Sequence, residues 1–347
     1  MKAICLIEKG DLAANKWGKL DCIDIPMPKI EKDDDILIKI AYSSICGSDP
    51  LMLNGNMDVP AGAGFGHEMS GVIVDMGKGC NKRNLKIGDK VTGCFVHFCG
   101  VCEECRAGRE QYCTASVQNI VPTQAEYVVW SEDQVYKLPD DADLKIAALV
   151  EPLTISLRAV EKAEIRMGDR VAVSGGGGIG LMVVQLCKMA GASEVTLIEP
   201  VEAKRALGLS LGADYGVDPA ASNFAAHIAN IAPAGFNVVI ECSGNGKAAE
   251  TALQIAKNAG HVIYLAMYPI HYRLPLDLNT YLYHKELRLE GLFLATYSFT
   301  PAIRMLKRMN LDPIIQKVYK LSECKQAYED QISGKYAKIV FDCDCSD

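Results

Sequence analysis

Residues 171–180 read VAVSGGGGIG, a short apolar run that leads directly into four consecutive glycines. The run from Val171 to Val173 has the length and composition of a buried strand. From Ile179 to Ala190, apolar residues recur at helical spacing. The stretch therefore predicts a strand, a tight glycine turn and a helix in direct succession.

The glycines of this turn have the spacing Gly175-x-Gly177-x-x-Gly180, which is typical of dinucleotide binding when it joins a strand to a helix. Gly175 permits the tight turn, Gly177 lets the backbone approach a pyrophosphate, and Gly180 allows helix and strand to pack closely. The free N–H groups at the start of the helix would face the phosphates. We therefore expect a dinucleotide to lie on Gly175, Gly177, Gly178, Ile179 and Gly180.

An acidic residue, Glu199, ends the next predicted strand. It lies about 20 residues beyond the glycines, where an acid binds the ribose 2′-hydroxyl of NAD. Because a carboxylate repels a 2′-phosphate, Glu199 favours NAD over NADP. Lys204 and Arg205 follow closely and are candidates for binding a cofactor phosphate, although we expect them to be exposed residues of the following helix.

Strands and helices continue to alternate around this core. The pattern predicts strands at Val195 to Ile198, Asn237 to Glu241 and His261 to Ala266, and helices at Val201 to Leu211 and Gly246 to Ala256. Such alternation predicts a parallel, doubly wound α/β sheet.

The first 150 residues have a different pattern. Ile36, Ile38 and Ile40 alternate with period two, Val72 to Val74 forms another apolar run, and glycines separate such segments. This pattern is typical of a compact, mostly β domain.

The end of the chain changes again. Thr300 and Pro301 resemble a helix N-cap and first helical residue, which predicts a helix to about Met309. A second helix over Glu323 to Ser333 and a strand over Ala337 to Phe341 complete the tail. We expect this tail to return to the first domain, so that the domains are residues 1–152, 153–294 and 295–347.

Four cysteines, Cys99, Cys102, Cys105 and Cys113, have the spacing C-x2-C-x2-C-x7-C. Four thiolates this close together can surround Zn²⁺ tetrahedrally and leave no position for a substrate. The pattern predicts a structural zinc site, with an iron–sulfur cluster as the minor alternative.

A second, open metal site is predicted from Cys46, His67, Glu68 and Glu151. These residues offer one thiolate, one imidazole and two carboxylates. Such a set can hold Zn²⁺ while one position remains for water or a substrate oxygen. A zinc ion lowers the pKa of a bound hydroxyl and polarises a carbonyl, which is the assistance that hydride transfer from an alcohol requires.

The composition excludes several classes of protein. The 347 residues carry a formal net charge of −7, which argues against nucleic acid or an anionic membrane as a partner. No apolar run approaches the roughly 20 residues that a bilayer requires. The opening MKAICLIEKG contains too short an apolar run for a signal peptide, so we expect a cytoplasmic protein whose 14 cysteines form no disulfide framework.

Taken together, these features resemble the zinc-containing medium-chain alcohol dehydrogenase family, and within it the polyol branch of sorbitol, threonine and butanediol dehydrogenases. The resemblance runs from about Asp35 to Phe341. It is carried by ICGSD, GHEMSGVI, LKIGDKV, CGVCEECRAGREQYC, AEYVV, VEPL, GDRVAVSGGGGIG, LGAD, ECSG and KELRLEG. It implies a GroES-like, mostly β catalytic domain, a Rossmann domain, an active site in the cleft between them, and a homodimer or homotetramer.

The resemblance also implies a role for each site residue. Cys46 and His67 match ligands of the catalytic zinc. Glu68 and Glu151 match the two acids near that zinc, and family members differ in which acid binds directly and which acts through water. Ser48 matches the hydroxyl residue that accepts the substrate proton. The structural-zinc lobe is matched by Cys99, Cys102, Cys105 and Cys113.

Two segments depart from the family pattern. Relatives often carry a histidine five residues after the ligand cysteine, where this chain has Leu51 preceded by Pro50. We therefore expect the proton to pass from Ser48 to water or to the cofactor ribose. Relatives also often have a Gly-Gly-aromatic run before AEY, where this chain has Pro122-Thr123-Gln124.

The leading hypothesis is an NAD-dependent, zinc-dependent oxidoreductase that acts on the secondary alcohol of a polyol or sugar alcohol. A vicinal diol or amino alcohol, such as butanediol or threonine, is the runner-up substrate. A zinc-free reductase of similar fold and a non-enzymatic NAD-binding protein are more distant alternatives, and Cys46, His67 and Glu68 argue against both.

Overall fold

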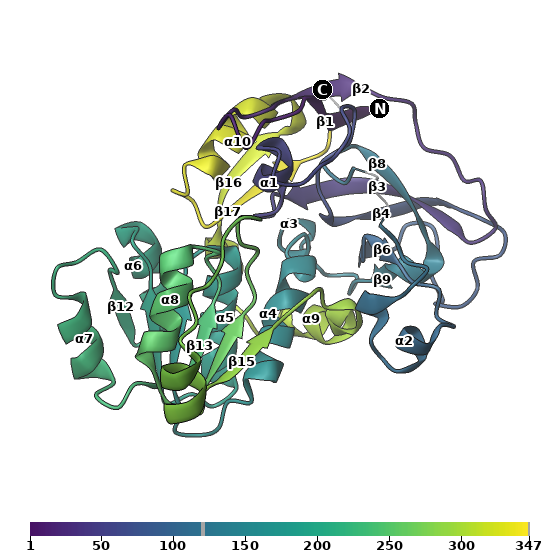
Figure 1. Cartoon of the computed structure of the whole chain (residues 1–347). Helices are drawn as coiled ribbons and strands as arrows, with labels where there is room; N and C mark the ends of the chain where they lie inside the picture. Colours follow the sequence, from purple (N-terminus) through teal and green to yellow (C-terminus); the bar gives the residue numbers. More distant parts are fainter. Residues whose placement is uncertain (119–121, 346–347) are drawn as a thin grey trace. The chain divides into compact units, whose positions relative to one another are not determined.

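A computed structural model describes residues 1–118 and 122–345 of the chain (Figure 1). Its contacts divide the chain into two compact units. The first unit contains Met1–Thr154 and Ala295–Asp347, and the second contains Ile155–Leu294. Helix α4 (Val150–Ala163) begins in the first unit and ends in the second.

The second unit contains a six-stranded sheet in the order β12-β11-β10-β13-β14-β15, and every neighbouring pair is parallel. Numbered along the chain, this is the order 3-2-1-4-5-6 of a Rossmann fold. The strands are β10 (Arg170–Ser174), β11 (Glu194–Ile198), β12 (Tyr215–Val217), β13 (Phe236–Glu241), β14 (Ala256–Tyr264) and β15 (Arg288–Gly291). The predicted parallel, doubly wound sheet is confirmed.

The helices of this unit are α5 (Gly178–Met189), α6 (Glu202–Ser210), α7 (Phe224–Ile231) and α8 (Gly246–Ile255), with a π-helical turn at Asn279–His284. Four of the five predicted strands and helices beyond β10 and α5 match to within two residues. The exception is β14, which starts at Ala256 rather than His261 and contains a register shift against β13. The short strands β12 and β15 lacked the buried apolar run that makes a strand visible in sequence.

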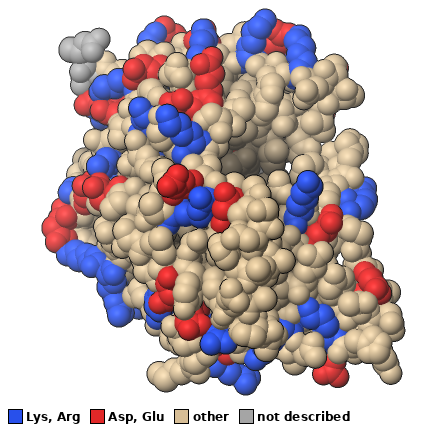
Figure 2. All heavy atoms as spheres, turned by 90° about the vertical axis from the view of Figure 1, so that its left-hand side faces the viewer, with Lys and Arg blue, Asp and Glu red and all other residues tan. Residues whose placement is uncertain are grey.

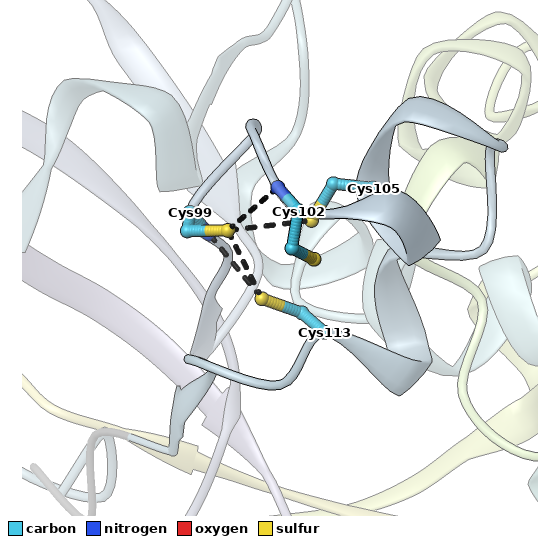
Figure 3. A group of neighbouring side chains, drawn as sticks. All are labelled: Cys99, Cys102, Cys105 and Cys113. Atoms are coloured by element: carbon cyan, nitrogen blue, oxygen red, sulfur yellow. Dashed lines mark hydrogen bonds between the residues drawn. The ribbon is translucent and has the colours of Figure 1, made fainter.

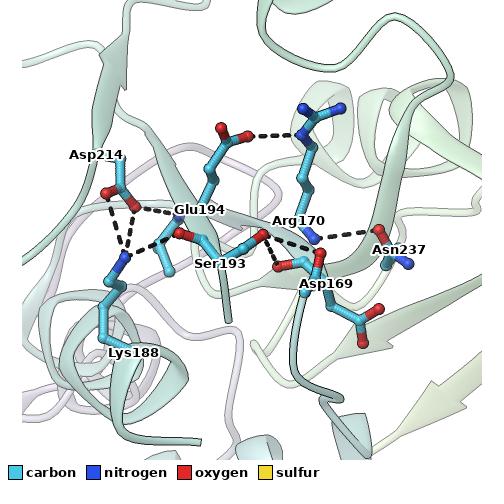
Figure 4. A network of polar contacts seen from close by, with 9 residues as sticks. Asp169, Arg170, Lys188, Ser193, Glu194, Asp214 and Asn237 are labelled. Carbon is cyan, nitrogen blue, oxygen red and sulfur yellow. Dashed lines mark hydrogen bonds and ion pairs between the residues drawn. The ribbon is translucent and has the colours of Figure 1, made fainter. Parts of the chain in front are cut away.

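A polar network ties together the strand ends opposite the glycine turn (Figure 4). The Arg170 guanidinium lies 2.6 Å from the Glu194 carboxylate across β10 and β11, and the Lys188 ammonium lies 3.0 Å from the Asp214 carboxylate. The Ser193 hydroxyl donates to the carbonyl of Asp169. Because these contacts join the amino ends of the strands, they leave the carboxyl ends, where such folds bind ligands, free of the network.

The first unit is built on a seven-stranded sheet in the order β16-β17-β3-β4-β5-β9, with β8 also paired to β3. Its strands are β3 (Asp35–Ser44), β4 (Glu68–Met76), β5 (Lys90–Gly93), β8 (Tyr127–Ser131), β9 (Val135–Lys137), β16 (Ile315–Lys320) and β17 (Lys338–Asp342). Two further pairs are β1 (Lys2–Glu8) with β2 (Lys19–Asp24), and β6 (Val96–His97) with β7 (Val117–Gln118). Ile36, Ile38 and Ile40 are fully buried, as their alternation predicts.

The helices of the first unit are short. They are α1 (Asp49–Leu53), α2 (Glu103–Arg106), α3 (Leu144–Ala147), α9 (Phe299–Met305) and α10 (Cys324–Ile332). Single 3₁₀ turns lie at Glu110–Tyr112, Glu132–Gln134, Thr296–Ser298, Asp312–Ile314 and Leu321–Glu323. The tail of the chain joins this unit through β17, which pairs antiparallel with β3.

One predicted helix start was wrong. Helix α9 begins at Phe299 with Ser298 as its N-cap, not at Pro301 with Thr300 as its N-cap, and it ends at Met305 rather than Met309. Pro301 lies in the first turn, where a backbone N–H has no intrahelical acceptor and its loss costs little. A proline is therefore tolerated at more than one position of that turn, and the sequence did not distinguish among them.

Candidate metal centres and dinucleotide site

The four cysteines of the C-x2-C-x2-C-x7-C segment come together around helix α2 (Figure 3). Their sulfur atoms lie within 4.8 Å of one another. The Cys99 sulfur is 3.5 Å from that of Cys113 and 3.9 Å from that of Cys105. A tetrahedron with zinc–sulfur bonds of about 2.3 Å has edges of about 3.8 Å, so this donor set fits a zinc ion.

The local backbone prepares these thiols for a cation. Backbone N–H groups of Val101 and Cys102 lower the pKa of Cys99, and those of Cys105 and Thr114 lower the pKa of Cys102 to about 6. Burial raises the pKa of the Cys105 thiol to about 12. Zinc binding needs all four thiols as thiolates. The cation itself must therefore stabilise the thiolates that the backbone N–H groups do not stabilise.

The second group is formed by Cys46, His67 and Glu68, whose ligand atoms also lie within 4.8 Å of one another. Strand pairing explains why they meet. Strands β3 and β4 are antiparallel, and Ser44 at the end of β3 pairs with Glu68 at the start of β4. Cys46 follows β3 and His67 precedes β4, so residues distant in sequence reach the same end of the sheet. The thiolate, imidazole and carboxylate of this group fit zinc.

Glu151 and Ser48 lie near this group but outside it. Glu151 is buried in the first turn of α4, and burial raises its pKa to about 7 while His67 opposes that rise. Ser48 precedes α1, two residues after Cys46, and its hydroxyl does not cap that helix. Pro50 and Leu51 occupy the first turn of α1 and carry no group that transfers protons.

Glu68 is held by a buried ion pair that the sequence did not suggest. The Lys338 ammonium on β17 lies 2.5 Å from Glu68 Oε2, and the two side chains are 7% and 1% exposed. Lys338 also donates to the carbonyl of Ile45 at 2.8 Å, and the Ser44 hydroxyl donates to Glu68 Oε2. A lysine in the apolar run from Ala337 to Phe341 was the available signal, since lysine is rarely buried unless it is paired.

Asp49 is a second residue that sequence reasoning missed. It is fully buried, and its Oδ2 accepts the backbone N–H of Cys46 at 3.0 Å. Its Oδ1 lies 3.8 Å from His67 Nδ1 and has no hydrogen-bond partner among the described residues. Burial raises the pKa of Asp49 to about 6, and His67 opposes that rise. An acid three residues after the ligand cysteine, within ICGSD, was the local signal.

The charges of this site favour a cation. Burial lowers the pKa of His67, but Cys46, Asp49 and Glu151 together raise it well above its ordinary value. Burial likewise lowers the pKa of Lys338, and Glu68 and Cys46 raise it overall. Four acidic side chains, Cys46, Asp49, Glu68 and Glu151, thus face two basic ones, and a bound divalent ion would balance the acidic groups when they ionise.

The glycine turn after β10 has the geometry that its spacing predicts. Gly175 has a φ of +100°, and a side chain at Gly180 would place its Cβ 1.8 Å from the Gly175 carbonyl oxygen. A Cβ at Gly177, the N-cap of α5, would meet no described atom within 4 Å. Among the described residues, no side chain caps α5. Gly178 and Ile179 form its first turn, so the turn leaves open space at a helix N-terminus, which suits a phosphate.

Glu199 is buried at the end of β11 and is bonded to this turn. Its Oε2 accepts the N–H of Gly176 at 2.6 Å, and its Oε1 accepts the N–H of Val201 at 2.9 Å. Lys204 lies 3.5 Å from Glu199 Oε1. Our expectation of an exposed Lys204 was wrong: it is buried, because one turn of α6 returns its side chain to the carboxylate.

Comparison with known proteins now identifies the family. Residues 32–140 match the alcohol dehydrogenase GroES-like domain, and residues 178–308 match the zinc-binding dehydrogenase domain. The chain belongs to the zinc-containing medium-chain alcohol dehydrogenase family. It is therefore an oxidoreductase of the alcohol dehydrogenase class.

Individual relatives match over nearly the whole chain. L-threonine 3-dehydrogenase of Pyrococcus horikoshii is 30% identical over 92% of this chain and 93% of its own length. D-arabitol-phosphate dehydrogenase of Enterococcus avium is 30% identical over 94% of each protein. The crystal structure of a protein assigned as a zinc-binding dehydrogenase from Clostridium scindens superposes with a TM-score of 0.93, at 38% identity and 99% coverage of both chains.

Two further observations concern the charges on the surface and the length and polarity of the helices. On the face drawn in Figure 2, positive and negative side chains are interspersed, and neither sign forms a large separate patch. Within residues 1–118 and 122–345, no helix is both long enough and apolar enough to cross a membrane.

Proposed function

We propose that this protein oxidises a secondary alcohol of a polyol or sugar alcohol with NAD as the hydride acceptor, and with a zinc ion at the Cys46 group. The observation that carries the proposal is the pairing of two sites in one chain. Cys46, His67 and Glu68 form a zinc-compatible set in the first unit, and the glycine turn with Glu199 forms a dinucleotide site in the second.

In the proposed metal site, Cys46, His67 and Glu68 hold the catalytic zinc directly and Glu151 acts beside it. Glu68 is preferred to Glu151 as the direct ligand because its oxygen lies within 4.8 Å of the other two donor atoms. When bound, the zinc supplies a Lewis acid for the substrate oxygen. Lys338 holds the Glu68 carboxylate in place. We assign the structural zinc to Cys99, Cys102, Cys105 and Cys113.

Ser48 is the proposed acceptor of the substrate proton. It lies next to the ligand turn, and its hydroxyl is not used to cap α1. Because Leu51 cannot pass a proton onward, we propose transfer from Ser48 to water or to the cofactor ribose. A Ser48→Ala variant should lose most of its turnover while retaining zinc and NADH binding. Full turnover across the pH range would exclude this role.

NAD is the proposed cofactor because Glu199 is held at the end of β11, where it can accept a hydrogen bond from a ribose hydroxyl. Its two oxygens already receive backbone N–H groups, but a carboxylate has about four acceptor positions. Glu199→Ala should therefore raise the KM for NAD with little change in kcat. Unchanged NAD kinetics, or a preference of the wild type for NADP, would contradict the assignment.

The substrate class rests on the polyol-like motifs and on relatives with two kinds of substrate. D-arabitol-phosphate dehydrogenase favours a polyol, and L-threonine 3-dehydrogenase favours an amino alcohol as the second candidate. The test is a panel of polyols, their phosphates, vicinal diols and amino alcohols, followed by NADH absorbance. A polyol should give the highest kcat/KM, and threonine as the best substrate would replace our proposal with the second candidate.

Zinc dependence is tested on the same preparation. Elemental analysis should find two zinc ions per chain, and a chelator should abolish turnover when the ion at the Cys46 group is removed. One ion per chain in fully active enzyme, or activity that survives complete metal removal, would overturn the proposed chemistry. We also propose a homodimer or homotetramer, which light scattering tests; a monomer in the active preparation would contradict it.

A further inference from the structure

Two buried hydrogen bonds lead from helix α10 to Asp49, whose carboxylate faces the histidine of the proposed metal site. The Tyr328 hydroxyl lies 2.9 Å from Gln124 Oε1, and Gln124 Nε2 lies 3.1 Å from Asp49 Oδ2. The other oxygen of Asp49 faces His67 Nδ1 at 3.8 Å. Tyr328, Gln124 and Asp49 are buried, so water does not compete strongly for these bonds.

The chemistry of the three groups fixes which group donates and which accepts in each hydrogen bond. A carboxylate only accepts hydrogen bonds, so the amide NH₂ of Gln124 must face Asp49. The amide oxygen then faces Tyr328, whose hydroxyl must donate. Burial raises the pKa of Tyr328 well above its ordinary value, which keeps the hydroxyl protonated as that donor.

Gln124 also packs directly on the segment that carries His67. Its backbone N–H donates to the Phe65 carbonyl at 3.0 Å. Gly66 has a φ of +90°, and a Cβ there would lie 2.6 Å from Gln124 Cγ. The Tyr328 ring contacts the Phe65 ring edge-on, with centroids 5.4 Å apart. Gln124 and Tyr328 therefore support the ligand segment from behind.

We propose that Gln124 and Tyr328 are positioning residues for the catalytic metal: they hold Asp49 so that it orients the imidazole of His67. The inference rests on the proposed function. Asp49 Oδ1 is a buried acceptor whose facing group is His67 Nδ1, so the held carboxylate favours a proton on Nδ1 and leaves Nε2 for the metal.

The test measures the rate at which zinc leaves the holoenzyme for an excess of a chromophoric chelator. Tyr328→Phe removes one oxygen atom, and Gln124→Met removes both polar groups at nearly constant volume. Each should accelerate zinc release from the Cys46 group, by no more than the about 10- to 100-fold that losing a direct partner of a metal ligand costs in metal affinity. The ion of the four-cysteine site should leave at the wild-type rate, which provides an internal control.

Two further variants separate positioning from general stability. Tyr319→Phe removes another tyrosine hydrogen bond, to Asp330 on the same helix α10, and should leave zinc release unchanged. In the double variant of Tyr328 and Gln124, the rate should equal that of Gln124→Met alone, because without Gln124 the tyrosine hydroxyl has nothing to orient.

The outcomes are distinct. Wild-type release rates in both single variants, or effects that multiply in the double variant, overturn the inference while the proposed function stands. An active wild type with one zinc per chain overturns the proposed function, and the inference falls with it. Thermal unfolding and NADH binding of each variant show that it is folded when the rates are compared.

Discussion

The buried ion pair behind the metal site makes the most demanding prediction. Replacing Lys338 by Met removes the ammonium that lies 2.5 Å from Glu68 Oε2 and leaves the Glu68 carboxylate buried with the Ser44 hydroxyl. The carbonyl of Ile45 loses its donor as well. The variant therefore leaves an unpaired charge in the core of the first unit.

The magnitude follows from this geometry. Two unit charges 2.5 Å apart attract by about 6–7 kcal/mol at an effective dielectric constant of about 20. The variant no longer buries an ammonium, which offsets part of that loss. Breaking one partner of such a pair costs about 3–5 kcal/mol in other proteins, and we expect a loss in this range for Lys338→Met when zinc is chelated. With zinc bound, the loss should be smaller because the cation partly neutralises Glu68.

The assay is urea unfolding followed by tryptophan fluorescence, with chelator and with zinc. The chain has two tryptophans, Trp17 and Trp130, and both lie in the first unit, so the signal follows the unit that changes. Lys325→Met is the matched control. Its ammonium pairs with Asp21 at an exposed position, so its loss should leave the stability nearly unchanged.

A second variant tests whether the unpaired Glu68 carboxylate causes the loss of stability. Adding Glu68→Gln to Lys338→Met removes the unpaired negative charge. The double variant should therefore recover part of the lost stability when zinc is chelated. The reasoning is refuted if Lys338→Met is as stable as the Lys325→Met control, or if zinc leaves the difference from wild type unchanged.

The remaining predictions concern the glycine turn and the four-cysteine site. Gly180→Ala forces a Cβ to within 1.8 Å of the Gly175 carbonyl oxygen and should destabilise the second unit by at least about 2–3 kcal/mol, measured by thermal unfolding. Gly177→Ala meets no described atom, so it should fold with a loss of about 1 kcal/mol or less, yet weaken NADH binding at least tenfold in a fluorescence titration; wild-type affinity would place the pyrophosphate elsewhere. Cys113→Ser should reduce the zinc content by one ion per chain and lower the melting temperature. The exposed Cys345→Ser should change neither, and equal zinc content in the two variants would refute the four-cysteine assignment.

Local patterns predicted the second unit well. The strand from Val171 to Val173, the glycine turn and the helix that follows involve contacts within a few residues, so their spacing in sequence sets their geometry. The same reason made the four-cysteine site predictable, since a single short segment supplies every thiol. Where one turn tolerates several arrangements, as at the start of α9, the pattern did not locate the boundary.

The amino-acid sequence by itself determined the donor types, the glycine turn and the order of strands and helices, because each depends on residues close together in the chain. Only the tertiary structure decided the surroundings of the site. Lys338 reaches Glu68, and Tyr328 reaches Gln124, across most of the chain length. Such pairs form only when β17 joins β3 and α10 packs on the same core, and burial then makes each bond strong enough to orient a ligand.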